Sequence, residues 1–278
     1  GGASKFTNIK KSNPENFIQC GISEANMIGV GCGLSSEGFI PYVHTFGPFA
    51  TRRVYDQIYL SGAYAHNTIN IYGSDPGFTV GPNGGTHTTW EDVALMREIP
   101  GSIIVDPCDE TQTRWVVKEL SKHEGVHYIR ANRKDVRNVY TPDSTFELGK
   151  GNVLREGKDI LIIVSGQLVS DALDCAEKLV EEGYSVEVID MYCIKPLDID
   201  LVLSESKGKK AVVTFENHSI YGGLGSAVAE VLMENGVNVP FKRHGVDERF
   251  GQVGTPDFLQ KEFQLTADDL YRTIKSMI

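Results

Sequence analysis

Two side chains suited to proton transfer lie in the first third of the sequence. Glu24 opens an otherwise apolar stretch, within the segment Gly-Ile-Ser-Glu-Ala-Asn at residues 21–26. A carboxylate there could be stabilised by a helix dipole, or buried and held protonated. His87 follows a loop at residues 81–85 with too many glycines for a helix or strand, and histidine carries protons near neutral pH. Taken alone, Glu24 is more simply an ordinary first-turn acid, and His87 is equally well a structural histidine.

Other side chains could bind rather than move protons. Phe46 and Phe49 flank a Gly-Pro turn and could together hold a flat ring, although phenylalanine usually packs in a core. Arg52 and Arg53 are adjacent and could bind an anion or form a solvated face. Arg130 and Arg133 follow an apolar strand, and ligands gather at the carboxyl ends of parallel strands. Their forked guanidinium groups suit phosphate or carboxylate, with a surface charge as the plainer alternative.

The elements that position these residues alternate between helix-like and strand-like patterns, which predicts an α/β fold with mainly parallel sheets flanked by helices. The patterns predict helices at residues 24–34, 49–65, 90–97, 109–124, 170–182, 226–235 and from 267 onward. They predict strands at residues 39–44, 67–72, 102–105, 126–130, 159–164, 185–190, 211–216 and 241–246. Residues 134–150 are polar and resemble a linker, so we expect two domains, 1–148 and 149–278. Because the chain opens at a glycine turn, we expect the first domain to lack its first helix and strand.

Composition excludes several classes of protein. The net charge of −10 over 278 residues argues against nucleic acid as a partner, while a few arginines in a cleft can still bind a small anion. No stretch approaches the roughly 18 apolar residues that span a bilayer, so no membrane is expected. The five cysteines are odd in number and lack metal-ligand spacing. We therefore expect reduced thiols, a cytoplasmic protein and no metal ligands in this chain.

Four motifs, in this order, resemble the transketolase family over essentially the whole chain. They are GISEAN, TFGPF followed by YDQI, VGPNGGTHTTWEDVALMREIPG, and VVTFENHSIYGGLGSAVAEVL. The resemblance implies a pyrimidine-binding domain followed by the transketolase C-terminal domain, with thiamine diphosphate as the cofactor. It implies that Glu24 hydrogen-bonds the aminopyrimidine ring and promotes its imino tautomer. Phe46 and Phe49 would line the pyrimidine pocket, and His87 would lie near the reacting carbon.

The resemblance also implies substrate residues. Arg133 matches the arginine that binds the phosphate end of a sugar phosphate, and Arg130, Arg52 and Ser4 are further candidates. Asn83 stands where transketolases usually carry an aspartate that reads a substrate hydroxyl. The segment Gly-Ser-Asp-Pro at residues 73–76 stands where they carry a phosphate-contacting histidine. These two departures leave a different sugar phosphate, or a sulfonated sugar, open as the substrate.

One part of the family's site has no counterpart in this sequence. The diphosphate and Mg²⁺ site of transketolases uses a Gly-Asp-Gly segment with a later asparagine, and nothing here matches it. We therefore expect an N-terminal transketolase subunit as partner, self-association and a heterotetramer. The expected activity is transfer of a two-carbon ketol unit from a ketose donor to an aldose acceptor. A deoxyxylulose-phosphate-synthase-like enzyme, a 2-oxoacid dehydrogenase beta subunit and a non-catalytic scaffold are the alternatives.

Overall fold

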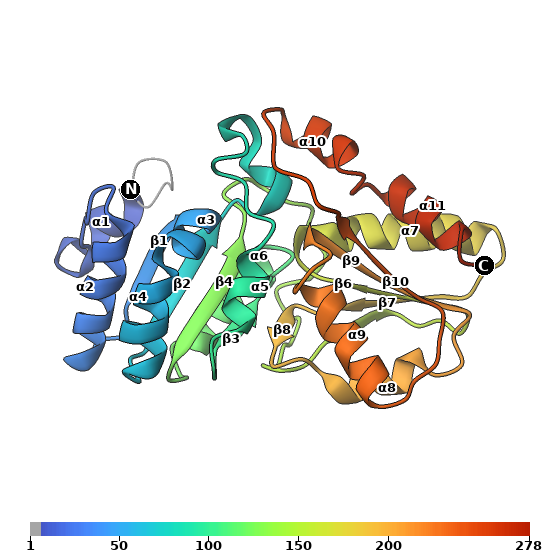
Figure 1. The fold of residues 1–278 in the computed structure, drawn as a ribbon, viewed down its shortest axis with the longest axis horizontal. Coiled ribbons are helices and arrows are strands. Elements are labelled where there is room, and N and C mark those ends of the chain that lie inside the picture. The colour runs from blue at the N-terminus through green and yellow to red at the C-terminus, as the bar shows by residue number, and fades with distance from the viewer. Residues whose placement is uncertain (1–6) are drawn as a thin grey trace.

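The computed structural model describes residues 7–278 and contains two five-stranded sheets, each flanked by helices (Figure 1). The predicted α/β class is confirmed. The first sheet has the order β1-β2-β4-β3-β8 and the second has the order β10-β9-β6-β7-β5. In Figure 1 the first sheet lies at the left and the second at the right, with β8 between them.

The first sheet is parallel except at one edge. It consists of β1 (Tyr42–Phe46), β2 (Ile69–Ser74), β4 (Val126–Ala131) and β3 (Ile103–Val105), followed by the antiparallel strand β8 (Cys193–Lys195). All six residues of the central strand β4 are buried, as expected when helices cover both faces of a parallel sheet. The carboxyl ends of β1, β2 and β4 consequently meet at one edge.

Helices cover both faces of this sheet. The elements in chain order are α1 (Thr7–Ser12), η1 (Pro14–Asn16), α2 (Glu24–Ser36), α3 (Gly47–Ala50), η2 (Arg52–Val54), α4 (Tyr55–Gln57), η3 (Ile58–Tyr64), η4 (Gly77–Asn83), α5 (Asp92–Arg97) and α6 (Glu110–Leu120). The single helix predicted at residues 49–65 is wrong in detail, because the segment is split into four short helical pieces of different pitch. Because the pitch changes from piece to piece, neighbouring side chains in this segment point in different directions.

The second sheet repeats the plan. It contains β10 (Phe241–Val246), β9 (Ala211–Ser219), β6 (Ile160–Val164) and β7 (Val186–Asp190) in parallel, with antiparallel β5 (Asn152–Arg155) at the edge. Helices α7 (Val169–Glu181) and α11 (Ala267–Lys275) cover one face, and α8 (Ile199–Ser206) and α9 (Leu224–Glu234) cover the other (Figure 1). Helix α10 (Pro256–Glu262) packs on η4 of the first domain.

The sequence patterns did not predict the antiparallel edge strands β5 and β8, nor α1, α8 and α10. Strand β8 has three residues, too few for a period-two pattern to be recognised. It belongs to the C-terminal half of the chain yet completes the sheet of the N-terminal half. No helix in the described residues has the length and apolar character needed to cross a bilayer.

Candidate active site at the ends of β1, β2 and β4

The carboxylate of Glu24 lies close to the aromatic cluster through a shared arginine. Glu24 begins α2, and its side chain is 11% exposed. Its Oε2 accepts a hydrogen bond from Nη1 of Arg53 at 2.9 Å. The guanidinium carbon of Arg53 lies 3.7 Å from the ring centroid of Phe49, in cation–π contact. The structure thus brings together Glu24 and Phe49, two residues that the sequence singled out separately.

Three rings form the centre of the cluster. The His87 ring lies 4.9 Å from the Phe49 ring and 5.3 Å from the Phe46 ring, both in edge-to-face arrangements. The two phenylalanine rings lie 6.2 Å apart, also edge to face. Thr86 Oγ1 lies 2.9 Å from Nδ1 of His87, so the tautomer decides which atom donates. All three rings are partly exposed, which leaves them accessible to a flat ligand.

Close backbone packing fixes this arrangement. Gly47 begins α3 between the two phenylalanines, and a Cβ there would lie 2.6 Å from the methyl group of Thr89. The loop that carries His87 turns at Gly84, where φ is +72°, a left-handed conformation that favours glycine. A Cβ on Gly85 would lie 2.3 Å from the carbonyl oxygen of Gly251 in the second domain. The second domain therefore packs against the histidine loop and positions it.

On its other side the cluster ends in an arginine–aspartate pair. The guanidinium carbon of Arg133 lies 4.6 Å from the Phe46 ring centroid, and Nε forms an ion pair with Oδ2 of Asp75. Asp75 follows β2 directly and is 1% exposed, whereas the side chain of Arg133 is 23% exposed. Burial raises the pKa of Asp75, and the positive charge of Arg133 works in the opposite direction.

The rings of His44 and Tyr72, on neighbouring strands β1 and β2, are 5.1 Å apart beneath this pair. Burial lowers the pKa of His44 to about 4, and burial raises the pKa of Tyr72 to about 12. Both side chains are therefore neutral near pH 7. Sequence patterns did not single out these two residues, because only strand register places them side by side.

The other predicted substrate residues have different surroundings. Arg130 is 1% exposed, and its donors bind Asp92, Asp106 and the backbone oxygen of Asn217, which argues against a role in binding substrate. Arg52 pairs with Glu91 at 2.6 Å on the surface and donates a hydrogen bond to the backbone oxygen of Thr86, next to His87. Asn83 is exposed at the end of η4, and Ser4 lies outside the described residues.

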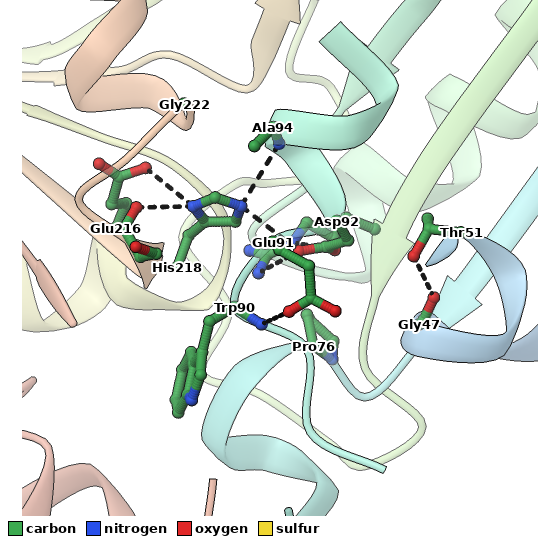
Figure 2. Close-up of polar contacts among 12 residues, drawn as sticks. Gly47, Thr51, Pro76, Trp90, Glu91, Asp92, Ala94, Glu216, His218 and Gly222 are labelled. Atoms are coloured by element: carbon green, nitrogen blue, oxygen red, sulfur yellow. Dashed lines mark hydrogen bonds and ion pairs between the residues drawn. The ribbon is translucent and has the colours of Figure 1, made fainter. Parts of the chain in front are cut away.

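Arg130 belongs to a buried network at the domain junction. Figure 2 shows Asp92 and His218 of this network next to each other. Although burial opposes ionisation of Asp92, the adjacent Arg130 lowers its pKa. Nε2 of His218 lies 3.5 Å from the amide nitrogen of Ala94 and 3.7 Å from Oδ1 of Asp92. Burial lowers the pKa of His218 to about 4, so the ring is neutral. This network joins β9 of the second domain to α5 of the first.

Glu216 caps α9 rather than binding a ligand. Its carboxylate accepts hydrogen bonds from the backbone N–H groups of Leu224 and Gly225 at 2.8 and 3.0 Å. A Cβ on Gly223 would lie 2.1 Å from the same carboxylate, so the glycine-rich turn at residues 222–225 is close-packed. Within residues 7–278 no group of three or more His, Cys, Asp or Glu side chains has an arrangement that suits a metal ion.

Two family models match this chain. The model described as transketolase, pyrimidine binding domain, matches residues 2–139, and the model described as transketolase, C-terminal domain, matches residues 149–270. The chain therefore belongs to the transketolase family, whose members generally use thiamine diphosphate. The first model ends at residue 139 and the second begins at residue 149. The domain boundary at residue 148 remains a prediction.

Relatives of similar length are parts of divided enzymes. The chain is 44% identical to the 6-deoxy-6-sulfo-D-fructose transketolase subunit SqwH of Clostridium sp. strain MSTE9, over 97% of this chain and 84% of that one. It is 38% identical to a putative transketolase C-terminal section of Methanocaldococcus jannaschii, over 98% of this chain and 86% of that one. It is 36% identical to a subunit of the apulose-4-phosphate transketolase of Phocaeicola vulgatus, over 86% and 77%.

Solved structures agree with this assignment. The chain matches a structure titled "Split gene transketolase, inactive beta4 tetramer" with a TM-score of 0.91 and 40% identity, covering 98% of this chain and 88% of that one. The fold also matches transketolase from Campylobacter jejuni, with a TM-score of 0.78 and 20% identity, over 93% of this chain and 39% of that one. The chain is accordingly a transketolase subunit, a transferase that acts together with a partner subunit.

Proposed function

We propose that this subunit supplies the pyrimidine half of a thiamine-diphosphate site that transfers a two-carbon ketol unit from a ketose to an aldose. The observation that carries the proposal is the contact series Glu24–Arg53–Phe49–His87, at the carboxyl edge of a parallel sheet. A largely buried carboxylate that Arg53 links to aromatic rings fits a flat, nitrogen-containing ring. The same edge carries an arginine for an anionic substrate.

When bound, thiamine diphosphate supplies the carbon nucleophile for cleavage of a ketose next to its carbonyl group. Glu24 would hydrogen-bond a ring nitrogen of the cofactor, and Arg53 would hold the Glu24 carboxylate in place. Phe46 and Phe49 would pack on the cofactor ring and exclude water. His87 would accept and return protons at the substrate hydroxyl and carbonyl oxygens.

The net reaction balances without an oxidant. The bond between C2 and C3 of the ketose breaks, and an equivalent bond forms to the aldehyde carbon of the acceptor. A proton leaves the C3 hydroxyl group of the donor, and one is added to the aldehyde oxygen of the acceptor. We propose that His87, whose partly exposed ring lies edge-to-face with both phenylalanines, handles both transfers.

The partner would hold the rest of the cofactor. We propose that an N-terminal transketolase subunit carries the diphosphate and Mg²⁺ ligands, and that two copies of each subunit form a heterotetramer in the cytoplasm. The divided relatives support the partner, and the split-gene neighbour, titled a beta4 tetramer, supports self-association. All five cysteines are free thiols, which is consistent with a reducing compartment.

The names of the relatives support an anionic sugar as substrate. One relative is named for 6-deoxy-6-sulfo-D-fructose and another for apulose 4-phosphate. For this chain we propose a ketose with an anionic tail that reaches Arg133. Neither the family models nor the relatives favour a 2-oxoacid dehydrogenase, a deoxyxylulose-phosphate synthase or a scaffold.

The deciding experiment compares wild type and Glu24→Gln in the reconstituted two-subunit complex. We expect Glu24→Gln to lower donor cleavage by at least about 100-fold, because the amide cannot supply the acidic hydrogen-bonding group. The wild-type chain without its partner should show no turnover. Circular dichroism and complex assembly of the variant should match those of wild type. Near-normal turnover by Glu24→Gln, or robust turnover by this chain alone, would contradict the proposal.

A further inference from the structure

We infer that the Asp75–Arg133 pair selects donors whose tail carries one negative charge over donors whose tail carries two. This inference rests on the proposed function, since it concerns the substrate of the same site. Asp75 is thereby a specificity-determining residue. The tail class that it favours is a sulfonate or carboxylate, and the class that it disfavours is a phosphate monoester.

The position of Asp75 is fixed by the backbone on both sides. Its amide nitrogen donates to the carbonyl oxygen of Ala131 on β4 at 3.1 Å. The carbonyl oxygen of Pro76, the next residue, accepts a hydrogen bond from Nδ2 of Asn217 in the second domain at 3.0 Å. With 1% exposure and this backbone anchoring, the carboxylate is a fixed buried group rather than a mobile surface group.

The Asp75 charge opposes that of Arg133. Their side chains form an ion pair, and a neutral Asp75 would leave the guanidinium without this partner. Arg133 also stacks on Phe46, which directs it toward the ring cluster. A tail that reaches Arg133 therefore meets a positive charge that a buried negative charge already partly cancels.

The other two arginines near the cluster are also paired with carboxylates. Arg53 pairs with Glu24, and Arg52 pairs with Glu91. The neutral rings of His44 and Tyr72 add no charge. Within residues 7–278, each of these three arginines, Arg133 included, is therefore paired with a carboxylate.

The two classes of tail differ in their charge at neutral pH. A phosphate monoester carries about −1.5 to −2 charges at neutral pH, whereas a sulfonate carries one. The repulsion from Asp75 scales with the charge of the tail, and so it penalises the phosphate more strongly. Arg133 also attracts the phosphate more strongly, but Asp75 offsets part of this attraction, whereas the cost of removing the tail from water rises steeply with its charge. The reduced attraction therefore favours the singly charged tail.

The test measures kcat/KM of the reconstituted complex for three donors: 6-deoxy-6-sulfofructose, fructose 6-phosphate and the neutral ketose erythrulose. Wild type should prefer the sulfonate to the phosphate. Asp75→Asn should lower the sulfonate-to-phosphate ratio by about tenfold, a value in the range expected for one nearby charge. Asparagine suits this site because, like aspartate, it tolerates the positive φ of 55° at this residue.

The controls separate charge from folding and from loss of the arginine. Asp174→Asn, on α7 of the second domain, changes the net charge equally and should leave the donor ratio unchanged. Arg133→Met should lower kcat/KM for both charged donors by a larger factor than for erythrulose. Circular dichroism should show that Asp75→Asn remains folded.

The outcomes distinguish this inference from the proposed function. If wild type cleaves none of the three donors, the proposed function fails and the inference fails with it. If wild type cleaves erythrulose but prefers the phosphate, or if Asp75→Asn keeps the wild-type ratio, only the charge selection by Asp75 is overturned.

Discussion

At the scale of single residues, the difference between two adjacent arginines is the most informative feature of the site. Arg53 contacts both Glu24 and Phe49, whereas Arg52 pairs with Glu91 on the surface. Both lie in the tight helical turn η2, where consecutive side chains point about 120° apart because each turn has about three residues. The sequence makes both arginines candidates for binding an anion, and in the structure it is Arg53 that contacts Glu24 and Phe49.

Arg53 should act as a positioning residue for Glu24. We expect Arg53→Met to lower kcat of the complex by about tenfold at saturating thiamine diphosphate, because the carboxylate loses its charged hydrogen-bond partner. Arg53→Lys should recover part of this loss, since it keeps the charge. Arg114→Met removes an exposed i,i+4 ion pair on α6 and serves as the control. Equal kcat in Arg53→Met and wild type would refute the positioning role.

At the scale of elements, the connection between the sheets is held by buried carboxylates. Residues 132–151 contain no helix or strand, yet Asp109 accepts hydrogen bonds from the backbone of Val139 and Tyr140. Asp190, the last residue of β7, accepts hydrogen bonds from the Tyr140 hydroxyl group at 2.7 Å and from Gln112 at 2.9 Å. The predicted linker is therefore anchored to both domains.

Asp190 makes stability depend on pH. Burial raises its pKa from 3.8 to about 7, so the folded chain keeps a proton that the unfolded chain releases in this window. Its contribution to stability is fully present below pH 3.8 and is lost as pH rises through 7. Asp190→Asn should remove this pH-dependent loss of stability. The loss is at most about 4 kcal/mol, because each unit of pKa shift corresponds to about 1.4 kcal/mol.

Urea unfolding of the chain at several pH values between 4 and 8 measures this effect. The free energy of unfolding of Asp190→Asn, relative to wild type, should increase across that range. Asp200→Asn, at an exposed position of α8, controls for the change in charge. A difference between Asp190→Asn and wild type that stays constant with pH would show that Asp190 does not titrate in this window.

At the scale of the whole molecule, the two domains share structural elements. Strand β8 extends the first sheet from the C-terminal half of the chain, pairing with β3. The buried guanidinium of Arg130 bonds to Asn217 in the second domain, and its partner Asp106 accepts a hydrogen bond from Ser165. Breaking such buried ionic networks is strongly destabilising, so the domains should depend on each other for stability.

A fragment of residues 1–148 should accordingly fail to fold cooperatively. It would keep Arg130 but lose strand β8, Asn217 and Ser165, and it would expose the edge of β3. Thermal unfolding followed by circular dichroism should show no sharp transition for this fragment. Adding a fragment of residues 149–278 should restore one. A cooperative transition of the first fragment alone, at the midpoint of the whole chain, would contradict this expectation.

Sequence by itself determined the α/β class, most of the parallel strands and the family, because alternating apolar periods and ordered motifs are local features of a chain. It also identified Glu24, Phe46, Phe49 and His87, whose chemistry is visible in their side-chain types. Their roles as catalytic and cofactor-binding residues remain predictions.

Tertiary structure decided which arginines reach the site. Arg130 lies within β4 and points into the domain junction, whereas Arg133, two residues beyond the strand, lies over Phe46. Spacing along the chain cannot distinguish them, because burial depends on segments more than 80 residues away, such as that of Asn217. The sequence singled out the segment at residues 73–76, but the pairing of Asp75 with Arg133 arises from strand register and packing, which no local pattern encodes.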